Sequence, residues 1–130
     1  MIVIDASAVL EIILATPTGL EVHDAMLVVG DEFGVPELLD LEVMQTLRRF
    51  LHRGELGQAR ASQALSILED LRLVRHSHQP YLRGIWARRH NHTAYDAAYL
   101  SLAEGWGAPL WTCDAKFVRT PSQRVEIRLF

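Results

Sequence analysis

Three aspartates occupy positions where the chain could assemble a metal site or an acid–base site. Asp5 ends a short apolar run at 1–5, Asp114 follows a predicted strand at 109–112, and Asp96 lies in the first turn of a predicted helix. Ionised carboxylates gathered at the apolar edge of a sheet repel one another and lose hydration. Together these positions therefore favour a site that binds a cation or changes its protonation.

Each aspartate also has a simpler structural interpretation. Asp5 is in position to cap a helix that begins at the next residue. Asp96 completes a capping box with Thr93, and Asp114 is suited to open a turn. For any one aspartate taken singly, capping is the more frequent role, so the functional interpretation depends on the three acting together.

Glu42 differs from the aspartates because it lies within a predicted helix. Its neighbours Leu41 and Val43 indicate a partly buried position, and the alternative is an ordinary solvated face. Gln45 and Arg49 follow three and seven residues later, so the three polar side chains share one stripe of the helix.

Strands and helices alternate along the chain, which predicts an α/β fold. Apolar periodicity and turn residues predict strands at 1–5, 32–35, 73–75, 109–112 and 125–129, and helices at 6–15, 18–29, 36–53, 56–71, 81–90 and 94–106. Pro36 is expected to be a first helical residue, and 114–117 a turn. This order favours a largely parallel sheet covered on both faces, with ligands at the carboxyl ends of the strands.

Length and composition indicate one globular domain spanning residues 1–130. The 130 residues are 49% hydrophobic, which is enough for a core without metal or disulfide support. Cys113 is the single cysteine, so a reducing, cytoplasmic location is the default expectation. The apolar runs are far shorter than the ~20 residues that span a bilayer, and the first residues lack the basic start of a secretory signal.

Charge is distributed unevenly along the chain. Residues 1–47 hold nine acids and no Lys or Arg, whereas residues 48–92 hold nine arginines and three acids. Arginine grips phosphate at two points, so the second stretch is either a phosphate-binding surface or a set of solvated helix faces. No glycine-rich phosphate loop, zinc-ligand spacing or serine-hydrolase elbow accompanies it.

Four short motifs resemble the PIN-domain ribonucleases, and within them the VapC-type toxins of bacterial and archaeal toxin–antitoxin pairs. The resemblance covers the whole chain and depends on the order and spacing of fragments that are weak singly. They are IVIDAS at 2–7, PELL at 36–39 followed by LEV at 41–43, YDAAYL at 95–100 with an alanine at 103, and WTCD at 111–114.

The resemblance assigns roles to residues that match the family's pattern. Its acidic quartet corresponds to Asp5, Glu42, Asp96 and Asp114, and two supporting hydroxyl positions correspond to Ser7 and Thr112. Two differences from the family's pattern affect whether a second metal ion can bind. Gln45 replaces the family's usual asparagine, and Lys116 and Arg119 lie where some members have a further acid.

By this resemblance, the expected fold is a PIN-like three-layer arrangement around a mostly parallel sheet of about five strands. The expected activity is endoribonuclease cleavage of structured RNA, such as a tRNA or rRNA loop. Carboxylate oxygens suit Mg²⁺, for which Mn²⁺ can substitute. Asp5, Asp96 and Asp114 are the expected metal ligands, and Glu42 is expected to orient or activate water.

The resemblance also implies partners. They are an RNA substrate, a VapB-type antitoxin that covers the acidic pocket, and a second copy of the chain in a homodimer. Arg49 is placed to hold a phosphate near the acids, and Arg88 and Arg89 lie just upstream of Asp96 where they could meet the RNA backbone.

Two other interpretations also fit the sequence. A non-catalytic PIN-like domain would bind RNA or protein without cleaving. A phosphoacceptor receiver domain has a similar length and aspartates at strand ends, but it expects adjacent acids after its first strand, where this chain has Ala6 after Asp5.

Overall fold

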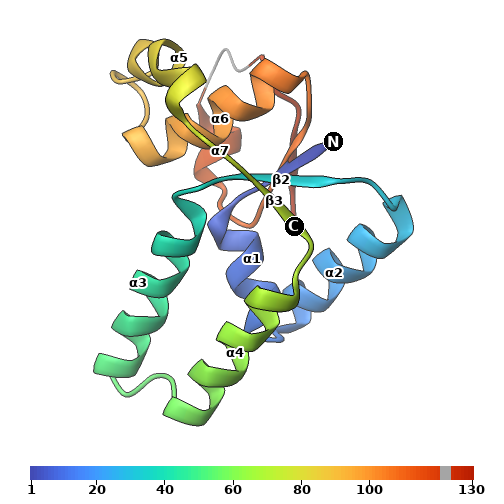
Figure 1. The fold of residues 1–130 in the computed structure, drawn as a ribbon, viewed down its shortest axis with the longest axis vertical. Helices are drawn as coiled ribbons and strands as arrows, with labels where there is room; N and C mark the ends of the chain where they lie inside the picture. Colours follow the sequence, from blue (N-terminus) through green and yellow to red (C-terminus); the bar gives the residue numbers. More distant parts are fainter. Residues whose placement is uncertain (121–123) are drawn as a thin grey trace.

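A parallel five-stranded sheet forms the centre of the protein. The computed structural model describes residues 1–120 and 124–130 (Figure 1). All strand pairs are parallel, and the strand order is β3-β2-β1-β4-β5. The strands are β1 (Ile2–Ile4), β2 (Phe33–Pro36), β3 (Leu73–His76), β4 (Leu110–Thr112) and β5 (Ile127–Leu129). The sheet is thus entirely parallel, where the sequence predicted a mostly parallel one.

This strand order excludes the receiver-domain alternative. Receiver domains have the doubly wound order 2-1-3-4-5, in which the first strand lies beside the second and third. Here β1 is central and lies between β2 and β4. The carboxyl ends of β1 and β4 are therefore neighbours, with Ile4 paired to Trp111.

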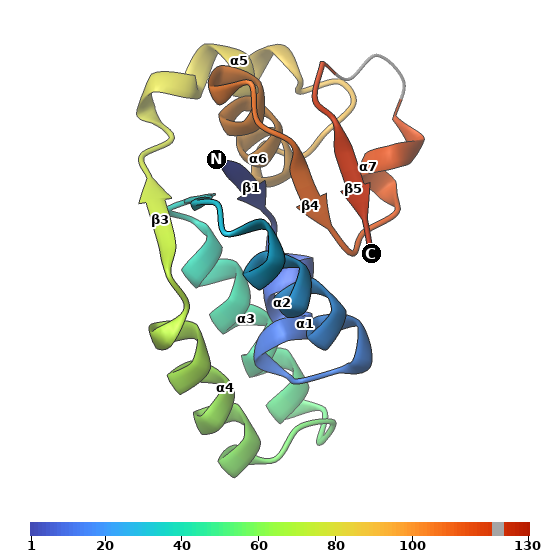
Figure 2. The same cartoon turned by 90° about the vertical axis from the view of Figure 1, so that its right-hand side faces the viewer.

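Helices connect the strands and cover the sheet. They are α1 (Ala6–Ile13), α2 (Pro17–Val29), α3 (Leu39–His52), α4 (Gln58–Asp70), α5 (Leu82–Ala87), α6 (Ala94–Trp106) and α7 (Lys116–Arg119), with a 3₁₀ turn at Gln79–Tyr81. Figure 2 shows α3 and α4 side by side as an arm that extends away from the sheet, while α5 and α6 lie at its other end.

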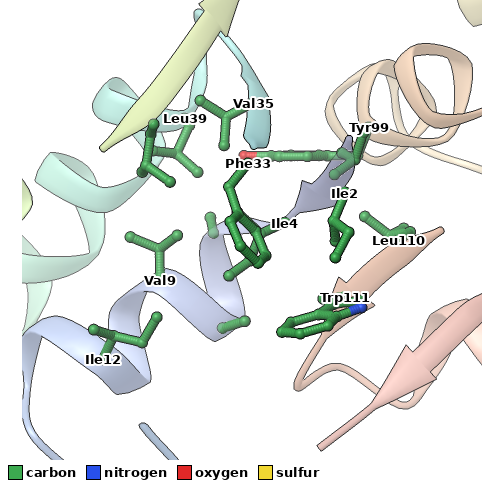
Figure 3. Close-up of a cluster of buried hydrophobic side chains, with 14 of the residues drawn as sticks. Ile2, Ile4, Val9, Ile12, Phe33, Val35, Leu39, Tyr99, Leu110 and Trp111 are labelled. Carbon is green, nitrogen blue, oxygen red and sulfur yellow. The ribbon is translucent and has the colours of Figure 1, made fainter. Parts of the chain in front are cut away.

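The core lies where α1 and α6 meet the central strands. Val3 and Ile4 of β1 are fully buried, as expected for a parallel strand covered on both faces. Figure 3 shows Ile4 between Val9 of α1 and Tyr99 of α6. Burial of these side chains supplies the main driving force that holds the two helices on the sheet.

Local signals explain how α1 and α2 begin and end. The Asp5 carboxylate caps α1 by accepting from the Ala8 amide, and Thr16 caps α2 by accepting from the Gly19 amide. Helix α2 ends at Gly30, whose φ of 59° lies in the left-handed region that glycine adopts without strain. The caps therefore set where the two helices begin, and Gly30 sets where α2 ends.

Several predicted boundaries differ from the structure. Pro36 was expected to open a helix, but it ends β2, and α3 begins only at Leu39. A proline is tolerated at this strand end because the next amide, that of Glu37, makes the bond to the His76 carbonyl. The predicted turn at 114–117 includes the start of α7. The predicted helix at 81–90 ends at Ala87, and the last strand begins at Ile127.

Within residues 1–120 and 124–130, no single helix is both long and apolar enough to cross a membrane. The consecutive helices α1 and α2 pass that test only as a pair bent by 105°.

Candidate functional site

Asp5 lies at the carboxyl end of β1 and is buried. Its Oδ1 accepts from the Ser7 hydroxyl at 2.7 Å, and its Oδ2 accepts from the Thr112 hydroxyl at 2.7 Å. Burial raises the pKa of this carboxyl, and the hydrogen bonds from Ser7, Thr112 and the Ala8 amide oppose that rise. The result is a carboxylate held in one orientation at the sheet edge.

Two hydroxyls join the end of β1 to the end of β4. The Cys113 amide donates to Ser7 Oγ at 2.9 Å, and the Asp114 amide donates to Thr112 Oγ1 at 2.9 Å. Because Thr112 also donates to Asp5, a single fully buried hydroxyl connects two of the predicted acids. Ser7 and Thr112 therefore both contact Asp5, and their supporting role in the site stays a prediction.

Lys116 forms ion pairs with both Asp96 and Asp114. Asp96 lies in the first turn of α6, which Thr93 caps by accepting from the Asp96 amide. The Lys116 ammonium lies 2.9 Å from Asp96 Oδ1 and 3.1 Å from Asp114 Oδ2. A single positive charge thus bridges two of the predicted metal ligands.

Glu42 projects from α3 and is held by a tyrosine of α6. The Tyr99 hydroxyl donates to Glu42 Oε2 at 3.2 Å. Burial raises the pKa of Glu42 to about 7, with the charges of Asp96 and Asp5 adding to the rise, while Tyr99 and Lys116 oppose it. Glu42 therefore belongs electrostatically to the same group of acids and changes its charge near neutral pH.

An open cleft of about 530 Å³ lies beside these acids. Glu42, Gln45 and Arg49 line it from α3, in the stripe that their spacing predicted. Asp96 and Lys116 line the other side. A ligand in this cleft would contact both acidic and cationic side chains.

The two remaining predicted arginines lie elsewhere. Arg88 forms an ion pair with Glu104 and donates to the Ser101 hydroxyl and the Gly84 carbonyl, which ties α5 to α6. Arg89 stacks over the Trp86 ring at 4.8 Å. Neither lines the cleft, so their contact with RNA stays a prediction.

Sequence reasoning did not assign Tyr99 or Lys116 to the site. Tyr99 follows Asp96 by three residues, one helical turn, and that spacing was the available signal. Lys116 was noted only as a departure from the family pattern. The ion pair from Lys116 to Asp96 of α6 depends on where α7 packs, and the local sequence does not predict that packing.

The donor set fits a hard cation in its chemistry. All four acids offer oxygen, which Mg²⁺ and Mn²⁺ prefer, and the charges of Asp5 and Asp96 raise the pKa of Glu42. Lys116 already places a positive charge between Asp96 and Asp114. Among the described residues, however, no three acidic, histidine or cysteine side chains lie close enough to form a ready-made metal cluster.

Known proteins resemble this chain over most of its length. The family described as PIN domain matches residues 2–122. Ribonuclease VapC12 of Mycobacterium tuberculosis is 33% identical over 99% of this chain and 98% of its own length. Ribonuclease VapC9 of the same organism is 35% identical over 92% of this chain and 91% of its own length.

Solved structures show the same fold. VapBC2 from Rickettsia felis, crystallised with a DNA fragment from its promoter, superimposes with a TM-score of 0.72. That likeness covers 100% of this chain and 99% of the other, at 14% identity. With its sheet order, its acids at the ends of β1 and β4, and the match over nearly its whole length, the chain belongs to the PIN domain family.

Proposed function

We propose that the protein is a metal-dependent endoribonuclease and the toxin of a toxin–antitoxin pair. The observation that carries this proposal is the electrostatic coupling of the acids at one end of the sheet. The charges of Asp5 and Asp96 act on Glu42, and the charge of Asp114 acts on Asp5. Glu42 and Asp96 also line an open cleft. The relatives named ribonuclease VapC support it, because they match the chain over almost its full length.

The chain's own residues divide the chemistry between them. Asp5, fixed by two hydroxyls, and Asp96 and Asp114 would hold Mg²⁺, or Mn²⁺ in its place. When bound, the ion supplies positive charge at the phosphate and lowers the pKa of a water. Glu42, with a pKa of about 7, is suited to take a proton from the attacking water at neutral pH. Tyr99 orients Glu42 for that role.

The cleft suits an unpaired segment of structured RNA, such as a tRNA or rRNA loop. Leu41 and Tyr95 line it and are 74% and 63% exposed, so unstacked bases have apolar and aromatic surfaces to lie against. Arg49 lies within the same cleft, where its guanidinium can bind a backbone phosphate.

The antitoxin has a candidate docking surface on the arm formed by α3 and α4. An open groove of about 610 Å³ runs between these helices and is lined by apolar side chains including Met44, Leu51 and Leu65. Arg48 and His52 lie among them. These features suit an amphipathic helix with acidic flanks, from a VapB-type antitoxin.

We further propose that the toxin forms a homodimer.

Cleavage of a total tRNA and rRNA pool tests the nuclease. The purified, partner-free protein is incubated with Mg²⁺, with Mn²⁺ or with chelator, beside an Asp96→Asn variant. Asp24→Asn, an exposed carboxylate on α2, is the matched control. We expect discrete fragments that require the ion, persist in Asp24→Asn and disappear in Asp96→Asn.

A different result would contradict the proposed nuclease activity. RNA bound by the wild type and left intact under every metal condition would overturn the nuclease proposal. It would favour the non-catalytic PIN-like interpretation.

A further inference from the structure

The chain has one lysine, and its ammonium lies between two of the acids of the site. Lys116 Nζ is 2.9 Å from Asp96 Oδ1 and 3.1 Å from Asp114 Oδ2. Its side chain is 51% exposed, so it reaches these carboxylates from the solvent side of the cleft. Every other basic side chain in the sequence is an arginine or a histidine.

The backbone around Lys116 is anchored. The Lys116 amide donates to Asp114 Oδ1 at 2.9 Å, so Asp114 accepts from both the backbone and the side chain of this residue. The next residue, Phe117, is 1% exposed and packs into the core. The lysine stem therefore starts from a fixed point and extends toward α6.

A divalent ion and this ammonium would compete for the same oxygens. An ammonium offers three donors and one positive charge, and here two carboxylates satisfy two of those donors. A divalent ion that ligated both Asp96 Oδ1 and Asp114 Oδ2 would occupy that space and repel the ammonium. Both cations cannot remain in contact with the same pair of oxygens.

We propose that Lys116 is an internal cation that competes with divalent metal for Asp96 and Asp114 and so lowers the affinity of the site for metal. The inference rests on the proposed function, because it concerns the same acids. In the metal-free protein the ammonium offsets repulsion between the two carboxylates. Metal binding to both of them requires the ammonium to leave, which weakens the affinity for metal.

Mn²⁺ binding to variants of Lys116 tests the competition. Lys116→Met keeps the length of the side chain and removes its charge, and Lys116→Arg keeps the charge as a matched control. Titration calorimetry with Mn²⁺ should show one ion bound by the wild type. For Lys116→Met we expect binding at least about tenfold tighter, since the competing charge is gone. Lys116→Arg should resemble the wild type.

The unsubstituted protein provides a second, independent readout. Lysine labelled with ¹⁵N at Nζ gives one side-chain signal, because the chain has one lysine. Addition of diamagnetic Mg²⁺ should move that signal, with a midpoint that matches metal binding. This measurement stays decisive even if Lys116→Met fails to fold.

Two results would overturn the inference. One is Mn²⁺ binding by folded Lys116→Met with the affinity of the wild type. The other is saturation of the wild type with Mg²⁺ while the lysine signal stays in place. RNA cleavage is scored separately, so a protein whose lysine is displaced by metal but which cleaves no RNA contradicts the proposed function alone.

Discussion

At the scale of single residues, each acid of the site is held by a nearby hydrogen-bond donor or by an ammonium. Hydroxyls and a backbone amide hold Asp5, an ammonium bridges Asp96 and Asp114, and a tyrosine holds Glu42. Glu42 has no cation in direct contact, and burial raises its pKa to about 7. Its protonation therefore reports on the site near neutral pH.

The stability of the metal-free protein should depend on pH through Glu42. Its pKa is about 7 in the folded chain and 4.5 in its ordinary state, so the folded protein binds the extra proton between these values. The free energy of unfolding should fall as pH rises from about 4.5 to 7, by about 1 kcal/mol after solvent screening. Urea unfolding in chelator measures this, and Glu42→Gln should flatten the profile. A wild-type profile that rises over this interval would contradict the prediction.

Removing the Tyr99 hydroxyl should change catalysis more than folding. The hydrogen bond from Tyr99 opposes the rise in the pKa of Glu42, so Tyr99→Phe should raise that pKa further. We expect the acidic limb of the pH–rate profile to move to higher pH, with roughly a tenfold loss of rate at pH 7. Tyr81→Phe is the control, and an unmoved limb in Tyr99→Phe would show that the hydroxyl does not position Glu42.

At the scale of elements, strand ends and helix starts bring the acids together. The placement of Asp5 and Asp114 was predictable, because both follow short apolar strands and parallel strands end at the same edge. The start of α3 was mispredicted, because Pro36 fits a strand end as well as a helix start. The bridge from Lys116 to Asp96 joins two elements distant in sequence, and local periodicity contains no information about such a contact.

The packing of α1 against α2 gives a test at this scale. At Gly19 an added Cβ would lie 1.9 Å from the Glu11 carbonyl oxygen, which is backbone and has no rotamer to change. Gly19→Ala should therefore destabilise the protein by about 3 kcal/mol through overpacking. Gly57→Ala meets nothing within 4 Å, and because Gly57 is the N-cap of α4 the change should cost at most about 1 kcal/mol. Thermal unfolding of both variants measures the difference, and equal melting temperatures would contradict the prediction.

At the scale of the whole molecule, an acidic stretch at 1–47 is followed by an arginine-rich stretch at 48–92, and the two largely cancel. The net charge is −3, so attraction to RNA has to come from local arginines rather than from the overall field. Arg49 is the arginine that the structure places in the cleft, at 3.1 Å from the Thr46 hydroxyl to which it donates. The affinity for RNA should consequently depend on a few arginine side chains.

Salt dependence measures how many phosphates those positions hold. Loss of one phosphate contact lowers the slope of log affinity against log salt by about 0.7 for a single strand. Arg49→Ala, measured on catalytically inactive Asp96→Asn protein, should show this reduction. Arg124→Ala, an exposed arginine outside the cleft, should not. Equal slopes in the two variants would exclude Arg49 as a phosphate contact.

The hydroxyl of Thr112 that binds Asp5 joins residues 107 positions apart. During synthesis, Asp5 is added 107 residues before Thr112, and Asp114 follows Thr112. A growing chain therefore holds its first acid without the partners that orient it. If the protein cleaves RNA, a translating ribosome makes it in an inert form, and prematurely terminated chains stay harmless to the RNA around them.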